Sequence, residues 1–168
     1  FKDYLVYQER ELGQSRLIVR HLSTGDEHTL SFNDSAYTIA SYGNNDINSD
    51  KLRVYYTSMT TPVSSYDIDL KSGDKTLLKQ QAVLGDFNAD NYASERIFIK
   101  ARDGIKVPVS LVYRKDTFKK EGTNPLLQYG YGSYGATMDP TFSSSRLSLL
   151  DRGFVFAIAH VRGSQMLG

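Results

Sequence analysis

The chain has 168 residues, of which 40% are hydrophobic and 23% are charged, a size that suits one domain or parts of two. Its 20 Lys and Arg residues nearly balance 19 Asp and Glu residues, and the net charge of +1 argues against nucleic acid or an anionic membrane as the main partner. The absence of cysteine excludes a disulfide framework, a thiolate metal site and a cysteine nucleophile.

The first residues, Phe1, Lys2 and Asp3, contain neither an initiator Met nor the start of a signal peptide. No apolar run approaches the roughly 20 residues that are needed to cross a bilayer. We therefore expect an internal piece of a cytoplasmic protein that has no membrane partner.

The first half of the chain predicts short antiparallel strands. It is rich in Tyr, Val, Ile and Thr, which favour strands, and polar turn residues such as those at 24–26 separate the apolar runs. Strands at this spacing indicate an antiparallel all-β module. The expected strands are residues 4–7, 16–20, 28–32, 37–42, 52–57, 65–70 and 76–78.

An internal repeat with an offset of 48 positions links two parts of this module. A period near 50 residues, with about four strands per unit, is typical of a β-propeller blade. Chance similarity between two hairpin turns is the alternative. We expect about two blades in residues 1–79, the first without its innermost strand, and the rest of the propeller before Phe1. The matched positions are Leu22 and Leu70, Gly25 and Gly73, Asp26 and Asp74, Leu30 and Leu78, and Val6-Tyr7 with Val54-Tyr55.

The pattern changes after about residue 79. Residues 80–93 show no clear period and are expected to form a connection. The next two expected strands, 95–100 and 105–113, flank Asp103-Gly104, a strong hairpin signal. Pro108 within the second strand favours an edge position or a bulge.

The remaining residues predict a βαβ unit. Residues 115–124 are expected to form a charged surface loop, and residues 125–129 a short buried strand. Residues 143–152 predict a helix that Gly153 ends. Residues 154–160 form a continuous apolar run, typical of a strand inside a covered parallel sheet.

Residues 130–135 (GYGSYG) match the G-x-G-x-x-G pattern of dinucleotide-binding loops. The expected helix begins near Ser143, too late for Gly135 to pack it directly on the strand. The following strand offers no acid for a ribose, although Arg162 could face a 2′-phosphate. A dinucleotide-binding βαβ segment therefore stays an alternative.

Ser133 lies two residues before Gly135, which suggests the G-x-S-x-G nucleophile elbow. Tyr131 stands where that motif needs its first glycine. We therefore interpret Ser133 as a serine in a tight glycine turn.

The three histidines do not predict a site. His21 and His28 lie on the blade-like hairpin, where we expect them at the surface. His160 ends the apolar strand, where a hydrogen-bonded structural role is expected. No spacing indicates a metal site or a Ser-His-Asp set, so the sequence predicts no metal and no cofactor.

Taken together, four segments resemble the prolyl oligopeptidase family of serine peptidases, and its oligopeptidase B branch in particular. The resemblance covers nearly the whole chain. Residues 52–62 (LRVYYTSMTTP) look like the last propeller blade, and residues 92–113 are similar to the first hairpin of the α/β-hydrolase domain. Residues 127–135 (LQYGYGSYG) and 159–163 (AHVRG) resemble the oxyanion loop and the next strand with its Arg-Gly loop.

The resemblance implies a mixed β and α/β fold: the last blades of a β-propeller over residues 1–79, then the start of an α/β-hydrolase peptidase domain over 80–168. It also implies hydrolysis of peptide bonds in short peptides after Lys or Arg. The nucleophile, acid and histidine would all follow Gly168, so the isolated chain is expected to be inactive. A non-catalytic, propeller-type binding module is the alternative.

By its place in the motif, Tyr131 corresponds to the oxyanion-hole tyrosine of the family, and Tyr134 is expected to line the substrate side. The loop at 163–168 (GSQMLG) departs from the family, which usually has further glycines and a Glu there. We further expect the chain to self-associate, because missing blades expose apolar faces and the strand near Ile158 is expected to be unpaired. Expected partners are therefore oligopeptide substrates and other copies of the chain.

Overall fold

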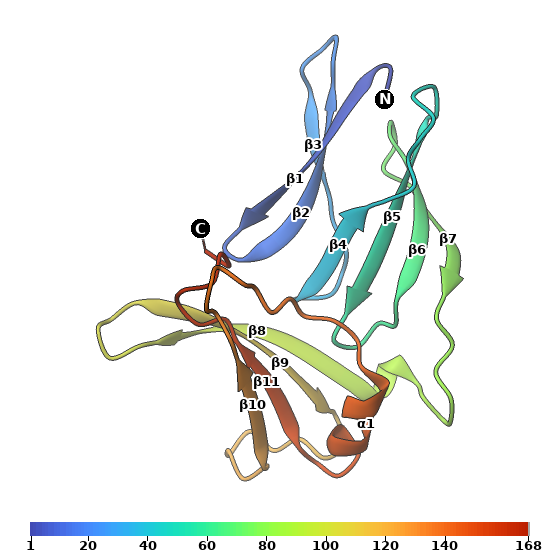
Figure 1. The fold of residues 1–168 in the computed structure, drawn as a ribbon. Helices are drawn as coiled ribbons and strands as arrows, with labels where there is room; N and C mark the ends of the chain where they lie inside the picture. The colour runs from blue at the N-terminus through green and yellow to red at the C-terminus, as the bar shows by residue number, and fades with distance from the viewer. Residues whose placement is uncertain (168) are drawn as a thin grey trace.

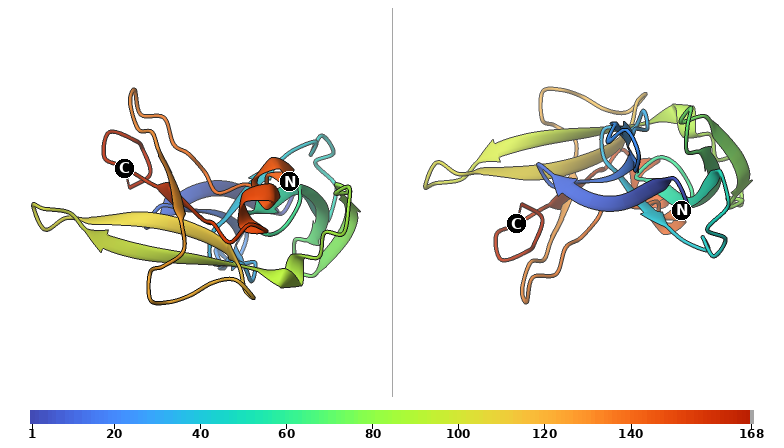
Figure 2. Two further views of the ribbon diagram at one scale, coloured as in Figure 1. Left: turned by 90° about the horizontal axis from the view of Figure 1, so that it is seen from below. Right: turned by 90° about the horizontal axis from the view of Figure 1, so that it is seen from above.

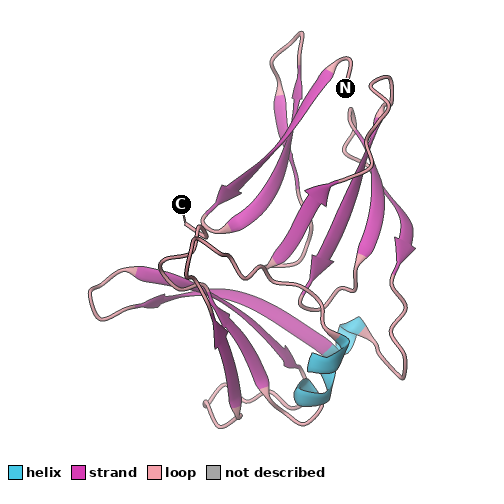
Figure 3. Ribbon diagram, viewed as in Figure 1, coloured by secondary structure: helices cyan, strands magenta, loops and turns pink. Residues whose placement is uncertain are grey.

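The computed structural model describes residues 1–167. Within these residues the chain forms three β-sheets and one α-helix (Figures 1 and 3). Two sheets lie side by side in the N-terminal half, and the third lies below them in the view of Figure 1. None of the helices among these residues is both long and apolar enough to span a membrane.

The first two sheets are antiparallel and are built from the strands that the alternating sequence predicts. The order in the first sheet is β1-β2-β3, and in the second it is β4-β5-β6-β7. The strands are β1 (Tyr4–Glu11), β2 (Gln14–His21), β3 (Glu27–Leu30), β4 (Tyr37–Ser41), β5 (Lys51–Ser58), β6 (Ser64–Asp69) and β7 (Lys75–Gln80).

The repeat in the sequence is a repeat in the structure. The turn after β2 is closed by a hydrogen bond from the His21 amide to the Asp26 carbonyl, at 2.9 Å. The turn after β6 has the equivalent bond from Asp69 to Asp74, also at 2.9 Å. Among residues 1–167, the first sheet has three strands and the second four, and the first has no counterpart of β4. The expected absence of the innermost strand from the first blade is therefore confirmed.

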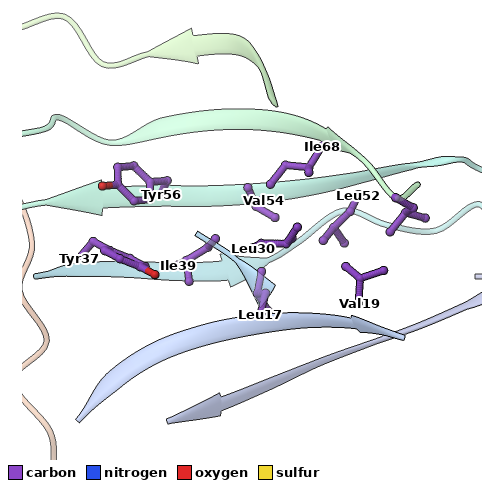
Figure 4. Packing of buried hydrophobic residues seen from close by; sticks show 10 residues of the cluster. Leu17, Val19, Leu30, Tyr37, Ile39, Leu52, Val54, Tyr56 and Ile68 are labelled. Carbon is purple, nitrogen blue, oxygen red and sulfur yellow. The ribbon is translucent and has the colours of Figure 1, made fainter. Parts of the chain in front are cut away.

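An apolar core joins these two sheets. On β5 the alternate residues Leu52, Val54 and Tyr56 point the same way and are at most 2% exposed. They meet Leu17 of β2 and Ile39 of β4, and Figure 4 shows these side chains interleaved. Burying each such side chain contributes about 1.5–3 kcal/mol.

The third sheet is mixed and has the order β10-β11-β9-β8. β10 and β11 are parallel, whereas β9 is antiparallel to both of its neighbours. The helix α1 connects the parallel pair, and the expected βαβ unit is thus confirmed. The elements are the 3-10 helix η1 (Ala89–Asn91), β8 (Tyr92–Lys100), β9 (Lys106–Arg114), β10 (Leu126–Gly130), α1 (Ser144–Leu150) and β11 (Val155–Ala159).

The second N-terminal sheet and the third sheet share a small core. Met59, in the turn between β5 and β6, is 2% exposed and packs with Tyr92 of β8, Val112 of β9, Leu150 of α1 and Ile158 of β11. The two halves of the chain are therefore in contact through side chains as well as through the connection at residues 81–88. Figure 2 shows α1 close to the second sheet from below.

The expectation of an edge position or a bulge at Pro108 is wrong, because β9 is an interior strand. The β9–β11 register ends at Val109 and Ala159, one residue before Pro108. The Pro108 carbonyl accepts a hydrogen bond from the His160 amide at 3.0 Å, on the β11 side. In a strand the N–H and C=O groups of one residue point to the same side. The N–H that Pro108 lacks would therefore face the end of β11, and the hydrogen bonds between β8 and β9 are not affected.

Two expectations about the end of the chain are also wrong. The apolar run at 125–129 predicts a buried strand, but all five residues of β10 are exposed. The sequence predicts an unpaired strand near Ile158, but β11 pairs with both β10 and β9. An apolar run predicts a strand but does not say which strand lies at an edge of the sheet, and here β10 lies at one edge and β8 at the other.

We expect the 168-residue chain to self-associate through the β10 edge. Leu126 and Leu127 are 56% and 43% exposed on β10, whose outer edge has no partner strand among residues 1–167, and Leu77 of β7 is 50% exposed. Light scattering should give a mass above that of a monomer, and Leu126→Lys should lower it by placing charge on the edge. A monomer with low 1-anilinonaphthalene-8-sulfonate binding and a cooperative melt would contradict this expectation.

Candidate active-site loop

The candidate oxyanion residue Tyr131 directly follows β10, where the parallel strands β10 and β11 end. In α/β sheets, ligands bind outside the carboxyl ends of the parallel strands. Tyr131 is 42% exposed, so part of its ring is accessible at this end of the sheet. A phenol in this place is able to donate a hydrogen bond to a group that lies above the sheet.

Tyr134 is at the tip of the same loop and is 99% exposed. Its backbone has a φ of +57°, a left-handed conformation that is uncommon for a residue other than glycine. Tyr134 contributes little packing, because nearly all of its surface is accessible. The side chain is free to meet a ligand but is not fixed in one position.

The glycines of residues 130–135 serve the packing of one loop on another. A Cβ atom at Gly163, whose φ is +92°, would lie 2.9 Å from the Gly132 carbonyl oxygen. A Cβ atom at Gly132 would lie 3.0 Å from the Ser164 amide nitrogen. The loop that carries Tyr131 and the loop after β11 therefore come together at a distance that only glycine allows.

Backbone hydrogen bonds fasten the same two loops. The Gly135 amide donates to the Gly163 carbonyl at 3.1 Å, and the Gln165 amide donates to the Gly135 carbonyl at 3.2 Å. The Ser133 carbonyl accepts from the Ala136 amide at 3.1 Å, which closes a tight turn. Ser133 thus lies in a glycine-flanked turn, as the sequence predicts.

This geometry does not match a dinucleotide-binding loop. In such a loop the last glycine packs the helix against the strand. Here Gly135 faces the side chain of Gln165, and α1 begins only at Ser144. The candidate cation Arg162 forms an ion pair with Asp103 of the β8–β9 hairpin.

His160 is a buried structural residue, as the sequence predicts. It is 4% exposed, and its Nε2 atom lies 2.8 Å from the hydroxyl of Ser110, which is fully buried on β9. Burial, assisted by the positive charge of Arg96, lowers the pKa of His160 from 6.5 to about 4. A neutral, buried imidazole without access to substrate does not act as the base of this site.

The other two histidines lie on the first sheet. His28 is exposed, as expected. His21 is half-buried and packs edge-to-face on Tyr4, with 5.0 Å between the two ring centroids. Among residues 1–167, no group of three or more His, Asp or Glu side chains is placed to hold a metal ion.

Sequence reasoning missed a cluster on the far side of the candidate loop. Arg10 of β1 forms a salt bridge with Asp139, which is 129 positions away in the sequence. Met166, from the loop after β11, is 1% exposed and lies 3.3 Å from the Arg10 guanidinium. No local pattern predicts a contact over such a separation.

Comparison with known proteins agrees with the fold. Residues 1–81 match the family described as prolyl oligopeptidase, N-terminal beta-propeller domain. The chain is 50% identical over 145 residues to dipeptidyl aminopeptidase BI of Pseudoxanthomonas mexicana, which covers 86% of the chain and 20% of that protein. It is 33% identical over 168 residues to protease 2 of Moraxella lacunata. This match covers 100% of the chain and 24% of that protein.

Solved structures extend the likeness beyond residue 81. The closed form of oligopeptidase B from Trypanosoma brucei, with covalently bound antipain, superposes with a TM-score of 0.89 at 36% identity. This match covers 100% of the chain and 25% of the solved one. The chain thus spans about a fifth to a quarter of the length of these relatives. It belongs to the prolyl oligopeptidase family, within the oligopeptidase B branch.

Proposed function

We propose that this chain is part of a longer serine peptidase that hydrolyses peptide bonds in short peptides after Lys or Arg. In this proposal the sheets up to about residue 80 are the last blades of the propeller. Residues after about 80 begin the α/β-hydrolase domain. The βαβ unit with its mixed sheet supports this assignment, since α/β-hydrolase folds carry their site at the ends of such strands.

The observation that carries the proposal is the place of Tyr131. It lies at the carboxyl end of β10, is 42% exposed, and belongs to a loop that is hydrogen-bonded to the next loop at Gly163 and Gln165. A fixed, neutral donor aimed at the developing oxyanion lowers the barrier of acyl transfer by about 2.7–4 kcal/mol. Tyr134 would line the substrate side, where its exposed ring would contact the peptide.

A second candidate function is removal of dipeptides from a free N-terminus. Its support is the 50% identity with a protein named dipeptidyl aminopeptidase BI. Both candidates use the same acyl transfer and the same oxyanion donor. They differ in whether the substrate must present a free amino group two residues before the cleaved bond.

The test uses the longer peptidase and two matched chromogenic substrates. One is an N-terminally blocked peptide that ends in Arg before the leaving group, and the other is the same peptide shortened to a free dipeptide. Cleavage of the blocked peptide, inhibited by a serine-directed reagent, supports the endopeptidase. Cleavage of the free dipeptide alone supports the second candidate. No cleavage of either would favour a non-catalytic binding module.

We expect the isolated 168-residue chain to be inactive on both substrates. One oxyanion donor without a nucleophile and a base leaves no covalent route to hydrolysis. The measurement is release of the chromogenic group at high protein concentration, with the longer peptidase as the positive control. Turnover that a serine-directed reagent blocks would contradict the assignment of the triad to residues after Gly168. The cytoplasmic location stays a prediction.

A further inference from the structure

The segment that follows the Tyr131 loop lies across the ends of both N-terminal sheets. In Figure 1 this segment, residues 136–143 in orange, runs between those sheets and the third sheet towards α1. It is bonded to a strand of the first sheet and to two strands of the second. The contacts, at 2.7, 2.9 and 3.1 Å, are from Arg10 of β1 to Asp139, from the Thr38 hydroxyl of β4 to the Pro140 carbonyl, and from the Phe142 amide to the Thr57 hydroxyl of β5.

The Arg10 contact is the only charged one of these three. Its Nη1 donates to Oδ1 of Asp139 at 2.7 Å, and its Nη2 donates to Oδ2 at 3.2 Å. This two-pronged geometry fixes orientation as well as distance. The side chains are 24% and 27% exposed, so the pair is largely shielded from solvent.

Arg10 also contacts the second of the two fastened loops. Its Nη1 lies 3.3 Å from the sulfur of Met166, which is 1% exposed. Met166 belongs to the loop whose residue Gln165 donates to Gly135 at 3.2 Å. One guanidinium group therefore holds both the segment after the Tyr131 loop and the loop packed against it.

The position of Arg10 is itself fixed by the third sheet. The Arg10 Nη1 donates to the Gly13 carbonyl at 3.2 Å, within its own β-turn. The Leu12 carbonyl in that turn accepts from Nη2 of Arg96 on β8 at 2.7 Å. The turn between β1 and β2 is thus anchored, and the guanidinium of Arg10 is presented to the two loops in a defined place.

We infer that Arg10 and Asp139 are positioning residues for the hydroxyl of Tyr131. This inference rests on the proposed function, in which Tyr131 stabilises the oxyanion. Tyr131 and Asp139 belong to one continuous segment, and Arg10 contacts both Asp139 and Met166, whose neighbour Gln165 donates to the Gly135 carbonyl of the Tyr131 loop at 3.2 Å. Loss of the ion pair therefore loosens the supports of that loop on both sides. Misplacement of a catalytic group by about 1 Å costs up to about 10²-fold in rate. A residue of the first N-terminal sheet would then influence the chemical step only by holding the Tyr131 loop in place.

The test is a double-mutant cycle in the longer peptidase. Asp139→Asn removes the charge and keeps the shape, and we expect kcat to fall about 10-fold to 10²-fold with little change in KM. In a protein that already carries Tyr131→Phe, the same substitution should change kcat less than about 2-fold, because the hydroxyl it positions is gone. Arg10→Lys keeps the charge but removes the bidentate guanidinium geometry, so it should lower kcat by an intermediate factor.

The matched control is Asp67→Asn. Asp67 forms an equally two-pronged pair with Arg53 in the second sheet, at 2.8 and 2.9 Å, without contact to either loop. This variant should leave kcat unchanged. Equal losses from Asp139→Asn with and without the Tyr131 hydroxyl would overturn the inference. If Tyr131→Phe itself leaves kcat unchanged, the proposed function fails instead. If Asp139→Asn does not fold, Arg10→Lys carries the same cycle.

Discussion

Replacement of Tyr131 by Phe in the longer peptidase should lower kcat about 10²-fold to 10³-fold and leave KM nearly unchanged. The substitution removes only the hydroxyl group. The ring stays on the fastened loop, so folding and substrate contact are preserved. A hydrogen bond that strengthens as the carbonyl oxygen becomes negative stabilises the transition state more than the bound substrate, which explains why kcat carries the loss.

The matched control is Tyr129→Phe, two residues earlier on β10. Tyr129 is 48% exposed, similar to Tyr131, but lies within the strand rather than in the loop. Loss of its hydroxyl should leave kcat unchanged. Tyr134→Phe distinguishes the roles of the two tyrosines in the loop. An effect of this variant on KM alone would indicate that Tyr134 contacts the substrate. An unchanged kcat for Tyr131→Phe would assign that residue to packing alone.

Acid should destabilise the fold through His160. Its pKa is 6.5 when exposed and about 4 in the folded chain, where burial disfavours the charged ring. Below pH 6.5 the unfolded chain binds a proton that the folded chain does not. The contribution of neutral His160 to the free energy of unfolding is therefore fully present above pH 6.5. It is lost as the pH falls to about 4, and the loss amounts to about 3 kcal/mol.

The measurement is the free energy of unfolding in urea between pH 7 and pH 4, at concentrations where the chain is monomeric. His160→Gln keeps a polar side chain that does not titrate in this range. It should be less stable than the parent at pH 7, but its stability should fall less steeply with acid. Carboxylates that titrate in both proteins cancel in the comparison. Parallel pH profiles would show that His160 is not the group responsible.

Much of the architecture could be predicted from local patterns. The 48-residue repeat matches the turns after β2 and β6, and the missing strand of the first sheet follows from the same alignment. Asp103-Gly104 lies in the turn between β8 and β9, and Gly153 follows the helix α1. These features are local because turn chemistry and side-chain alternation act over a few residues.

The candidate site could be predicted only in part. The motif at residues 130–135 identifies the loop and its tyrosines, but not what the glycines do. Only the structure shows that Gly132 meets Gly163, because the close approach involves a second loop about 30 positions away. The same pattern of glycines would suit a phosphate-binding turn if a helix followed at once.

Local sequence patterns are sufficient to predict the strands, the repeat, the helix and the loop that carries Tyr131, because each depends on neighbouring residues. The folded structure is needed to show that β10 is an exposed edge strand, that Pro108 lies where β11 ends, and that Arg10 meets Asp139 across 129 positions. The physical reason is that these features depend on strand order and on contacts between sheets. Hydrophobic pattern alone is the same for an apolar strand at the edge and for one inside the sheet.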